Sequence, residues 1–197
     1  MITNVHQLSS DKVYSYADYL TWKFEERVEL IKGKLFRMSP APTRRHQRIS
    51  FQITSQISPY FEENPCQVYY APFDVRLFDS KKSKKADKEI YSVVQPDISV
   101  ICDLEKLDDR GCLGAPDWII EIISPGNSKK ELDDKYHLYE ANGVREYWIV
   151  HPNDQTIVAF ELQDDKYHLR RIYSSEENAP VGIFKDLELN LQEVFRD

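Results

Sequence analysis

The sequence predicts an α/β protein with a mixed central sheet, because two buried strands flank one crossover helix. Residues 118–123 are apolar on both faces of the two-residue strand alternation, which is typical of a central strand covered on each side. A polar helix is predicted from about residue 128 to residue 142, where Gly143 ends it, and residues 146–150 form the next buried strand. Strands joined by such a helix run parallel, so the unit is a βαβ crossover.

Length and composition predict a single domain spanning residues 1–197. The chain has 197 residues, of which 41% are hydrophobic, enough to build one sizeable core. Its longest apolar runs are far shorter than the roughly 20 residues that a membrane span needs. The N-terminal residues lack the basic and then apolar pattern of a signal peptide. We therefore expect a cytoplasmic protein without a membrane partner.

The other elements follow from hydrophobic spacing and turn residues. Ile49, Ile53 and Ile57 recur at helical spacing, and Lys32-Gly33 suits a hairpin turn that needs positive φ. In chain order we predict a helix at 16–26, a hairpin at 28–38, a helix at 43–61, a strand pair at 66–78, a strand at 93–102, the crossover, a hairpin at 157–162 and 167–173, and a closing helix or strand at 187–195.

The three cysteines predict neither a disulfide framework nor a zinc site. Cys66, Cys102 and Cys112 are odd in number and widely spaced, with no CxxC motif and no nearby histidine cluster. We expect ordinary thiols.

The charge of the chain argues against binding nucleic acid by bulk electrostatics. Lys and Arg number 26 against 33 Asp and Glu, a net charge of -7. Two local basic clusters could still contact phosphate, although the lysine run also suits a solvated hairpin tip. Their members are Arg44, Arg45 and Arg48 in the first cluster, and Lys81, Lys82, Lys84, Lys85 and Lys88 in the second.

Two acidic residues stand in apolar strands, where an ionised carboxylate costs several kcal/mol without a cation or strong donors. Glu121 interrupts the run 118–123, and Asp97 follows Pro96 at the head of an apolar strand. Each alone could pair with an arginine or cap a turn. On neighbouring strands, however, the two could converge on a hard cation such as Mg²⁺, which prefers oxygen ligands.

Lys135 on the crossover helix is the third candidate. The apolar residues Leu132, Tyr136 and Tyr139 form a stripe on this helix, and Lys135 borders it. The lysine could merely cover apolar surface with its stem, or it could place its ammonium beside the two acids. On either interpretation a Lys135→Met replacement is expected to change stability little.

These motifs together resemble the Uma-type restriction endonuclease family of the PD-(D/E)xK nuclease superfamily. The resemblance runs from about residue 16 to residue 161. It rests on Pro96-Asp97, Glu121-Ile122-Ile123-Ser124-Pro125, Lys135 and the stretch from Gly143 to Trp148, with Glu29-Leu30-Ile31-Lys32-Gly33 and His46 as weaker matches.

The resemblance implies a restriction-endonuclease-like α/β/α core, a divalent metal (Mg²⁺ or Mn²⁺) at Asp97 and Glu121, and DNA as substrate. The superfamily pattern has a lysine where this chain has Ile123; Lys135 fits the family's variant, in which the lysine has moved to the next helix. Glu29 and His46 match further site positions, although Glu29 also suits a hairpin surface and His46 a helix start.

The sequence therefore predicts a metal-dependent endonuclease in which Asp97 and Glu121 bind Mg²⁺ and Lys135 stabilises the charge that develops on the phosphate. The alternative is a catalytically inactive module that keeps the fold and binds nucleic acid or protein. Motifs of serine hydrolases, P-loop proteins, dinucleotide-binding proteins and zincins are absent. A homodimer is a further expectation, since two-fold pairing is common among oligomers.

Overall fold

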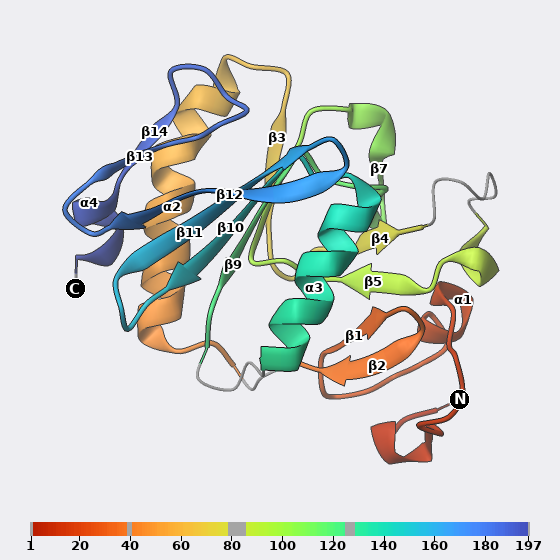
Figure 1. Cartoon of the computed structure of the whole chain (residues 1–197). Helices are drawn as coiled ribbons and strands as arrows, with labels where there is room; N and C mark the ends of the chain where they lie inside the picture. The colour runs from red at the N-terminus through yellow and green to blue at the C-terminus, as the bar shows by residue number, and fades with distance from the viewer. Residues whose placement is uncertain (1, 39–40, 79–85, 125–128, 197) are drawn as a thin grey trace.

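A computed structural model of the chain describes residues 2–38, 41–78, 86–124 and 129–196. Its larger layer is a six-stranded sheet formed by β3 (Gln67–Tyr70), β6 (Ile98–Ile101), β9 (Trp118–Ile122), β10 (Glu146–His151), β11 (Thr156–Gln163) and β12 (Lys166–Ser174), in the order β12-β11-β10-β9-β6-β3. The helices α2 (Arg44–Glu62) and α3 (Lys129–Asn142) cover opposite faces of this sheet (Figure 1).

A second six-stranded sheet packs on the α3 side and corrects the expectation of one central sheet. It consists of β1 (Val28–Ile31), β2 (Lys34–Arg37), β4 (Val75–Leu77), β5 (Ser92–Val94), β7 (Leu107–Asp108) and β8 (Gly111–Leu113), in the order β2-β1-β5-β4-β8-β7. A two-stranded sheet of β13 (Asn178–Pro180) and β14 (Glu188–Asn190) completes the strands.

The predictions of one strand at 93–102 and of a strand pair at 66–78 are wrong. β5 and β6 belong to different sheets, and so do β3 and β4. Between β5 and β6 stand Gln95, Pro96 and Asp97; proline has no N–H to donate to a ladder, and the chain changes sheet there. This break places Asp97 directly before the first residue of β6.

The predicted βαβ crossover is confirmed. β9 and β10 pair in parallel, from Trp118 opposite Glu146 to Ile122 opposite Val150, and α3 connects them. Gly143 adopts φ 83° just after the helix, a conformation that glycine reaches without strain. The predicted turn after Ser124 falls on residues 125–128, outside the described part of the chain.

The helix predicted at 43–61 is confirmed as α2. Thr43 caps its first turn by accepting a hydrogen bond from the amide of His46. The buried face carries Ile49, Ile53 and Ile57, which pack with β9 and β10 in the same core cluster. The predicted closing segment is part strand and part helix, since β14 leads directly into α4 (Leu191–Phe195).

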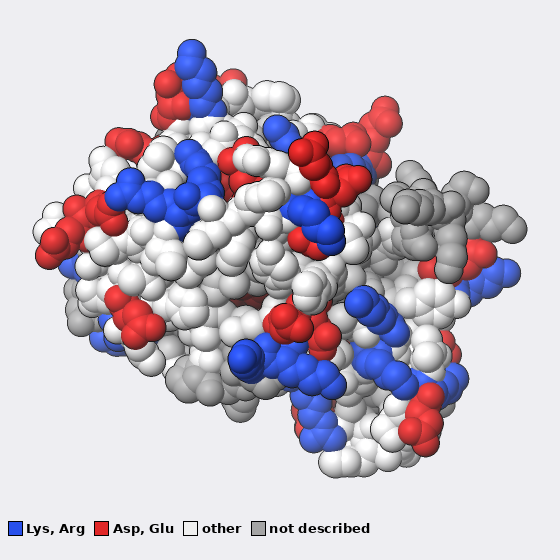
Figure 2. Space-filling model, viewed as in Figure 1, with Lys and Arg blue, Asp and Glu red and all other residues white. Residues whose placement is uncertain are grey.

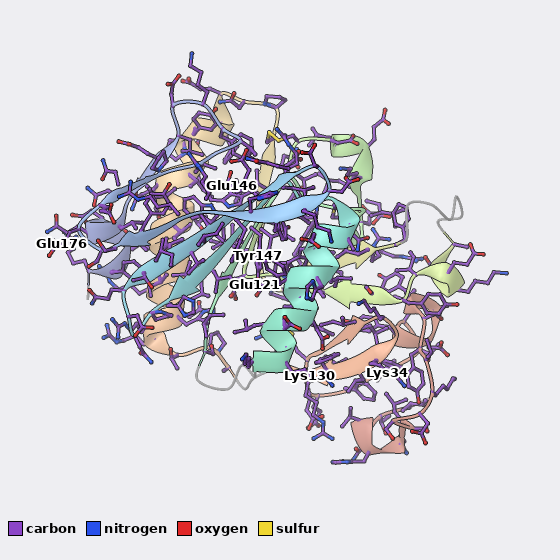
Figure 3. All side chains as sticks on the ribbon, in the orientation of Figure 1. Lys34, Glu121, Lys130, Glu146, Tyr147 and Glu176 are labelled. Atoms are coloured by element: carbon purple, nitrogen blue, oxygen red, sulfur yellow. A yellow bond between two sulfur atoms is a disulfide. The ribbon has the colours of Figure 1, made fainter. Side chains whose placement is uncertain are left out.

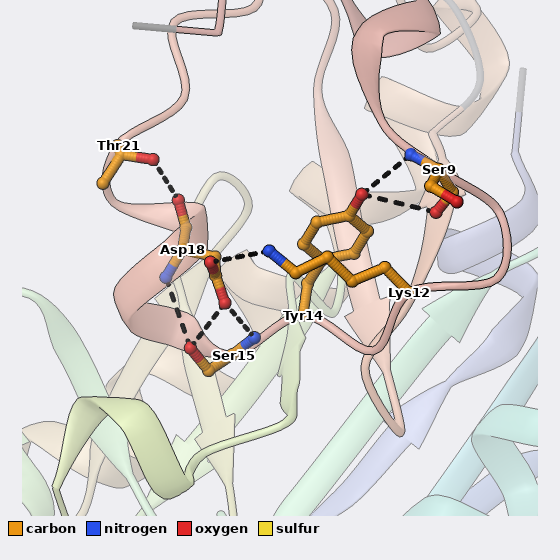
Figure 4. Close-up of polar contacts among 6 residues, drawn as sticks. All are labelled: Ser9, Lys12, Tyr14, Ser15, Asp18 and Thr21. Atoms are coloured by element: carbon orange, nitrogen blue, oxygen red, sulfur yellow. Dashed lines mark hydrogen bonds and ion pairs between the residues drawn. The ribbon is translucent and has the colours of Figure 1, made fainter.

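The predicted N-terminal helix is much shorter than expected. It exists as α1 (Tyr16–Tyr19), capped by Ser15, whose hydroxyl accepts from the amide of Asp18 (Figure 4). The amides of Thr21 and Trp22 bond three residues back, to Asp18 and Tyr19, which tightens and ends the helix. Short helices η1 (Val5–Gln7), η2 (Asp87–Glu89) and η3 (Leu104–Lys106) complete the helical elements.

The predicted hairpin at 28–38 is confirmed as β1 and β2. Lys32 and Gly33 at its turn both have positive φ, 52° and 74°, as a two-residue primed turn requires. Residues of β1 are all buried, because β5 pairs along its other side. The hairpin thus has an inner strand that can contribute to a buried site.

The cysteine prediction is wrong, since Cys66 and Cys102 form a disulfide. β3 and β6 pair antiparallel with Gln67 opposite Ile101, so the residues one step beyond this pair face each other. Cys112 is a free and buried thiol. No helix in the described part of the chain is long and apolar enough to cross a membrane.

Candidate active site

A cavity of about 330 Å³ brings together all five residues that the sequence predicted as catalytic. It opens where the β1–β2 hairpin, the start of α2, the end of β9 and the first turns of α3 meet. The five residues in its lining are Glu29, His46, Asp97, Glu121 and Lys135. They come from five separate segments, so the fold assembles the site.

Strand pairing sets the two acids side by side. β6 and β9 pair antiparallel with Ile98 opposite Ile120, and continuing this register places Asp97 opposite Glu121. The Asp97 Oδ2 atom accepts a hydrogen bond of 2.7 Å from the amide of Ile122. Because Ile120 and Ile122 face α2, Glu121 between them faces α3 (Figure 3).

Lys135 lies buried between two carboxylates. Its Nζ atom is 3.0 Å from Oε2 of Glu29 and 3.0 Å from Oε1 of Glu121, and all three side chains are at least nine-tenths buried. Glu29 also accepts a hydrogen bond of 2.7 Å from the amide of Gln95. Glu29 is therefore no surface residue, and Lys135, at the cavity wall, is only 6% exposed.

This burial corrects two expectations about α3. The buried residues of the helix are Lys135, Leu138 and Tyr139, so its inner face is turned toward Lys135 relative to the predicted stripe. A Lys135→Met replacement would leave two carboxylates facing each other without a cation, and removing one partner of a buried ionic group is strongly destabilising. On this geometry we therefore expect a large loss of stability in place of little change.

Tyr139 is a member of the site that the sequence reasoning assigned only to the core. Its hydroxyl donates a hydrogen bond of 2.7 Å to Oε1 of Glu121, the same oxygen that Lys135 contacts. The signal that could have found it is its spacing, since residues four apart on a helix lie on one face. Burial raises the pKa of the Tyr139 phenol, which keeps it a donor at neutral pH.

The pKa values of Glu121 and Lys135 are both raised, for different reasons. Burial raises the pKa of the Glu121 carboxyl, with Lys135 offsetting part of this effect and Asp97 and Glu29 adding to it. For Lys135, burial lowers the pKa but Glu121 and Glu29 outweigh it, so its pKa rises well above the ordinary value. The ammonium thus stays charged, whereas burial disfavours the ionised form of Glu121.

His46 contacts the second acid. Its Nε2 atom is 3.3 Å from Oδ2 of Asp97, and the ring is buried at the start of α2. Burial lowers the pKa of His46, but the bond to Asp97 and its charge outweigh this, and the net pKa is raised. The imidazole thus holds Asp97 from the α2 side.

The donor set fits a cation held by few protein ligands. Within the described residues, no three His, Cys, Asp or Glu side chains form a metal cage. Mg²⁺, however, is commonly bound through one or two carboxylates and keeps several waters. Asp97 and Glu121 supply two carboxylates to one cavity, and the group of Glu29, Glu121 and Lys135 carries one net negative charge when ionised.

The structure describes the first predicted basic cluster, but most of the second lies outside the described residues. Arg44, Arg45 and Arg48 do not line the cavity, and the Nε atom of Arg48 donates to the carbonyl of Arg196 near the C-terminus. The lysines at 81, 82, 84 and 85 lie outside the described residues. Arg27, which the sequence reasoning did not single out, does line the cavity. In Figure 2 acidic and basic side chains are interspersed, with basic ones gathered over the hairpin and the start of α3.

Comparisons with known proteins show the family and the fold. The family model described as "Uma2: Putative restriction endonuclease" matches residues 16–192. An uncharacterized protein of Synechocystis, slr1290, is 20% identical over 151 residues, 75% of this chain and 74% of that protein. The crystal structure of a putative DUF820 nuclease from Anabaena variabilis matches with a TM-score of 0.68 and 22% identity, over 92% of this chain and 97% of that chain. The last similarity establishes the fold.

Proposed function

Because the chain belongs to the Uma2 family, whose model matches residues 16–192, we propose that it is a metal-dependent DNA endonuclease with a restriction-endonuclease-like core. One observation carries the proposal. Lys135 is buried between two carboxylates at the wall of a cavity that also holds Asp97. A purely structural core would gain nothing from an excess buried negative charge, since desolvating charges is costly.

In this proposal Asp97 and Glu121 hold Mg²⁺ or Mn²⁺. A bound divalent ion lowers the pKa of a water and polarises a phosphate oxygen. His46 and the amide of Ile122 both contact Oδ2 of Asp97 and so fix its carboxylate. Lys135 stabilises the charge that develops on the phosphate as water attacks the phosphorus atom and the bond to the leaving oxygen breaks.

The experiment compares wild type with Glu121→Gln, using Mn²⁺ and Mg²⁺ calorimetry together with cleavage of supercoiled plasmid DNA. We expect metal-dependent cleavage by the wild type, and loss of both metal binding and cleavage in the variant. The matched control is Glu146→Gln, the same change at a buried glutamate outside the cavity. A wild type that binds DNA without metal-dependent cleavage would support the inactive binding module instead.

Partners follow from the same proposal. Arg27 and the N-terminal basic residues of α2 would meet the DNA backbone, and such contacts weaken steeply with salt. Two copies related by two-fold symmetry would serve cleavage of both strands, which sedimentation of the protein on a palindromic duplex would test.

A further inference from the structure

Glu121 receives two hydrogen bonds from α3, and both reach the same oxygen. Lys135 and Tyr139 are four residues apart and so lie on one face of the helix. Their donors are 3.0 Å and 2.7 Å from Oε1 of Glu121. Two donors on Oε1 restrict rotation of the carboxylate group. The position of the other oxygen, Oε2, is thereby fixed as well.

The two donors differ in how firmly they can fix that plane. The ammonium of Lys135 contacts both Glu121 and Glu29, and it stands on a flexible four-carbon stem. Tyr139 has a rigid ring, is fully buried, and directs its hydroxyl to Glu121. Its ring packs edge-on against Tyr147 with centroids 5.1 Å apart, which limits rotation of the phenol.

We infer that Tyr139 is a positioning residue that fixes the orientation of the Glu121 carboxylate, which would leave Oε2 available to a cation bound in the cavity. This inference rests on the proposed function. Tyr139 is 0% exposed and is absent from the cavity lining, so it does not touch substrate. Hydrogen-bond partners behind metal-binding carboxylates contribute to affinity by fixing the ligand, and their loss typically costs about 10- to 100-fold.

The chain offers a closely matched control on the neighbouring strand. Tyr147 on β10 is also fully buried and touches the Tyr139 ring, but its hydroxyl has no hydrogen-bond partner among the described residues. Tyr139→Phe and Tyr147→Phe therefore each delete one buried oxygen, from two rings that pack against each other. Only the first deletion removes a contact with Glu121.

The test measures Mn²⁺ affinity of the full chain by calorimetry for wild type, both tyrosine variants and Glu121→Gln. We expect Tyr139→Phe to weaken Mn²⁺ binding by about 10- to 100-fold and Tyr147→Phe to leave it unchanged. The Mg²⁺ concentration for half-maximal cleavage should rise by the same factor in Tyr139→Phe, while kcat at saturating Mg²⁺ falls much less. A purely structural role would lower the unfolding midpoint without changing metal affinity.

Two results would overturn the inference in distinguishable ways. Unchanged Mn²⁺ affinity in a folded Tyr139→Phe protein, with binding lost in Glu121→Gln, would refute the positioning role and leave the proposed function standing. Equal Mn²⁺ affinity in wild type and Glu121→Gln would refute the metal site itself, and the role of Tyr139 with it.

Discussion

The two buried glutamates Glu121 and Glu146 lie on adjacent parallel strands and are held in opposite ways (Figure 3). Glu146 is 0% exposed and points to the α2 face, where it accepts hydrogen bonds from the Trp148 indole and from the amides of Gly182 and Ile183. Three donors share its two oxygens. Glu121 points to the α3 face, borders a cavity, and shares its cation with a second acid.

The difference shows that a buried acid is not by itself a functional sign. Burial raises the pKa of both carboxyls, although the three donors lower that of Glu146 in part. Glu146 is satisfied locally by backbone and indole donors and by the guanidinium of Arg170, whose Nη1 atom lies 3.7 Å from its Oε1. At Glu121 the charges do not balance, and the cavity gives access to a cation that would balance them.

The largest effect is expected from removing the ammonium of Lys135 beside Glu121. In Lys135→Met, Glu29 and Glu121 lose their shared ammonium, so the metal-free protein should be destabilised by about 3–5 kcal/mol at pH 8. Cleavage should fall by about 10²-fold or more, the scale of losing one preorganised charge. Urea unfolding and plasmid cleavage measure the two effects.

The pH dependence of this loss has a defined sign. Lys135 lowers the pKa of Glu121, so its removal raises that pKa further above the unfolded value. A raised folded pKa means that stability is lost as pH rises, and the deficit should shrink toward pH 5. In the double variant Glu29→Gln with Lys135→Met the net charge of wild type returns, so part of the stability should recover while cleavage stays low. A deficit independent of pH would contradict the ionic explanation.

A smaller effect, on stability alone, is expected from changing Glu146. Glu146→Gln places an amide N–H₂ group against donors, so one of Trp148, Gly182 or Ile183 loses its acceptor. An unsatisfied buried donor costs about 1–3 kcal/mol. Urea unfolding should show this loss, whereas cleavage by the folded variant should match wild type. A large loss of cleavage would remove the contrast between the two glutamates.

The sequence predicted the crossover, and it selected residues that line one cavity, because both predictions used local patterns. Continuous apolar strands, a polar helix of fitting length and Gly143 specify the βαβ unit from nearby residues alone. Asp97, Glu121 and Lys135 were selected by their chemistry within these elements. All three line one cavity, as the hypothesis required.

The remaining features depend on pairing between distant segments. Glu29 is buried because α3 and the segment after β5 pack against it, and nothing in residues 28–38 indicates these partners. The Cys66–Cys102 disulfide depends on the register of β3 with β6, which the cysteine spacing does not reveal. Residues 93–102 likewise look like one strand in the sequence. Only the pairing of β5 in the second sheet shows that they form two.

The smallest effect is expected from Tyr147→Phe, which separates burial from hydrogen bonding within the core. Tyr147 follows Glu146 on β10 but faces the Glu121 side, where its hydroxyl has no partner among the described residues. Burying an unpaired hydroxyl costs free energy, so its removal should leave stability unchanged or raise it by about 1 kcal/mol. Urea unfolding at pH 7 measures the difference. A destabilisation above about 1 kcal/mol would mean that the hydroxyl is hydrogen-bonded in solution. Tyr147 would then be a further donor near Glu121, beside Lys135 and Tyr139.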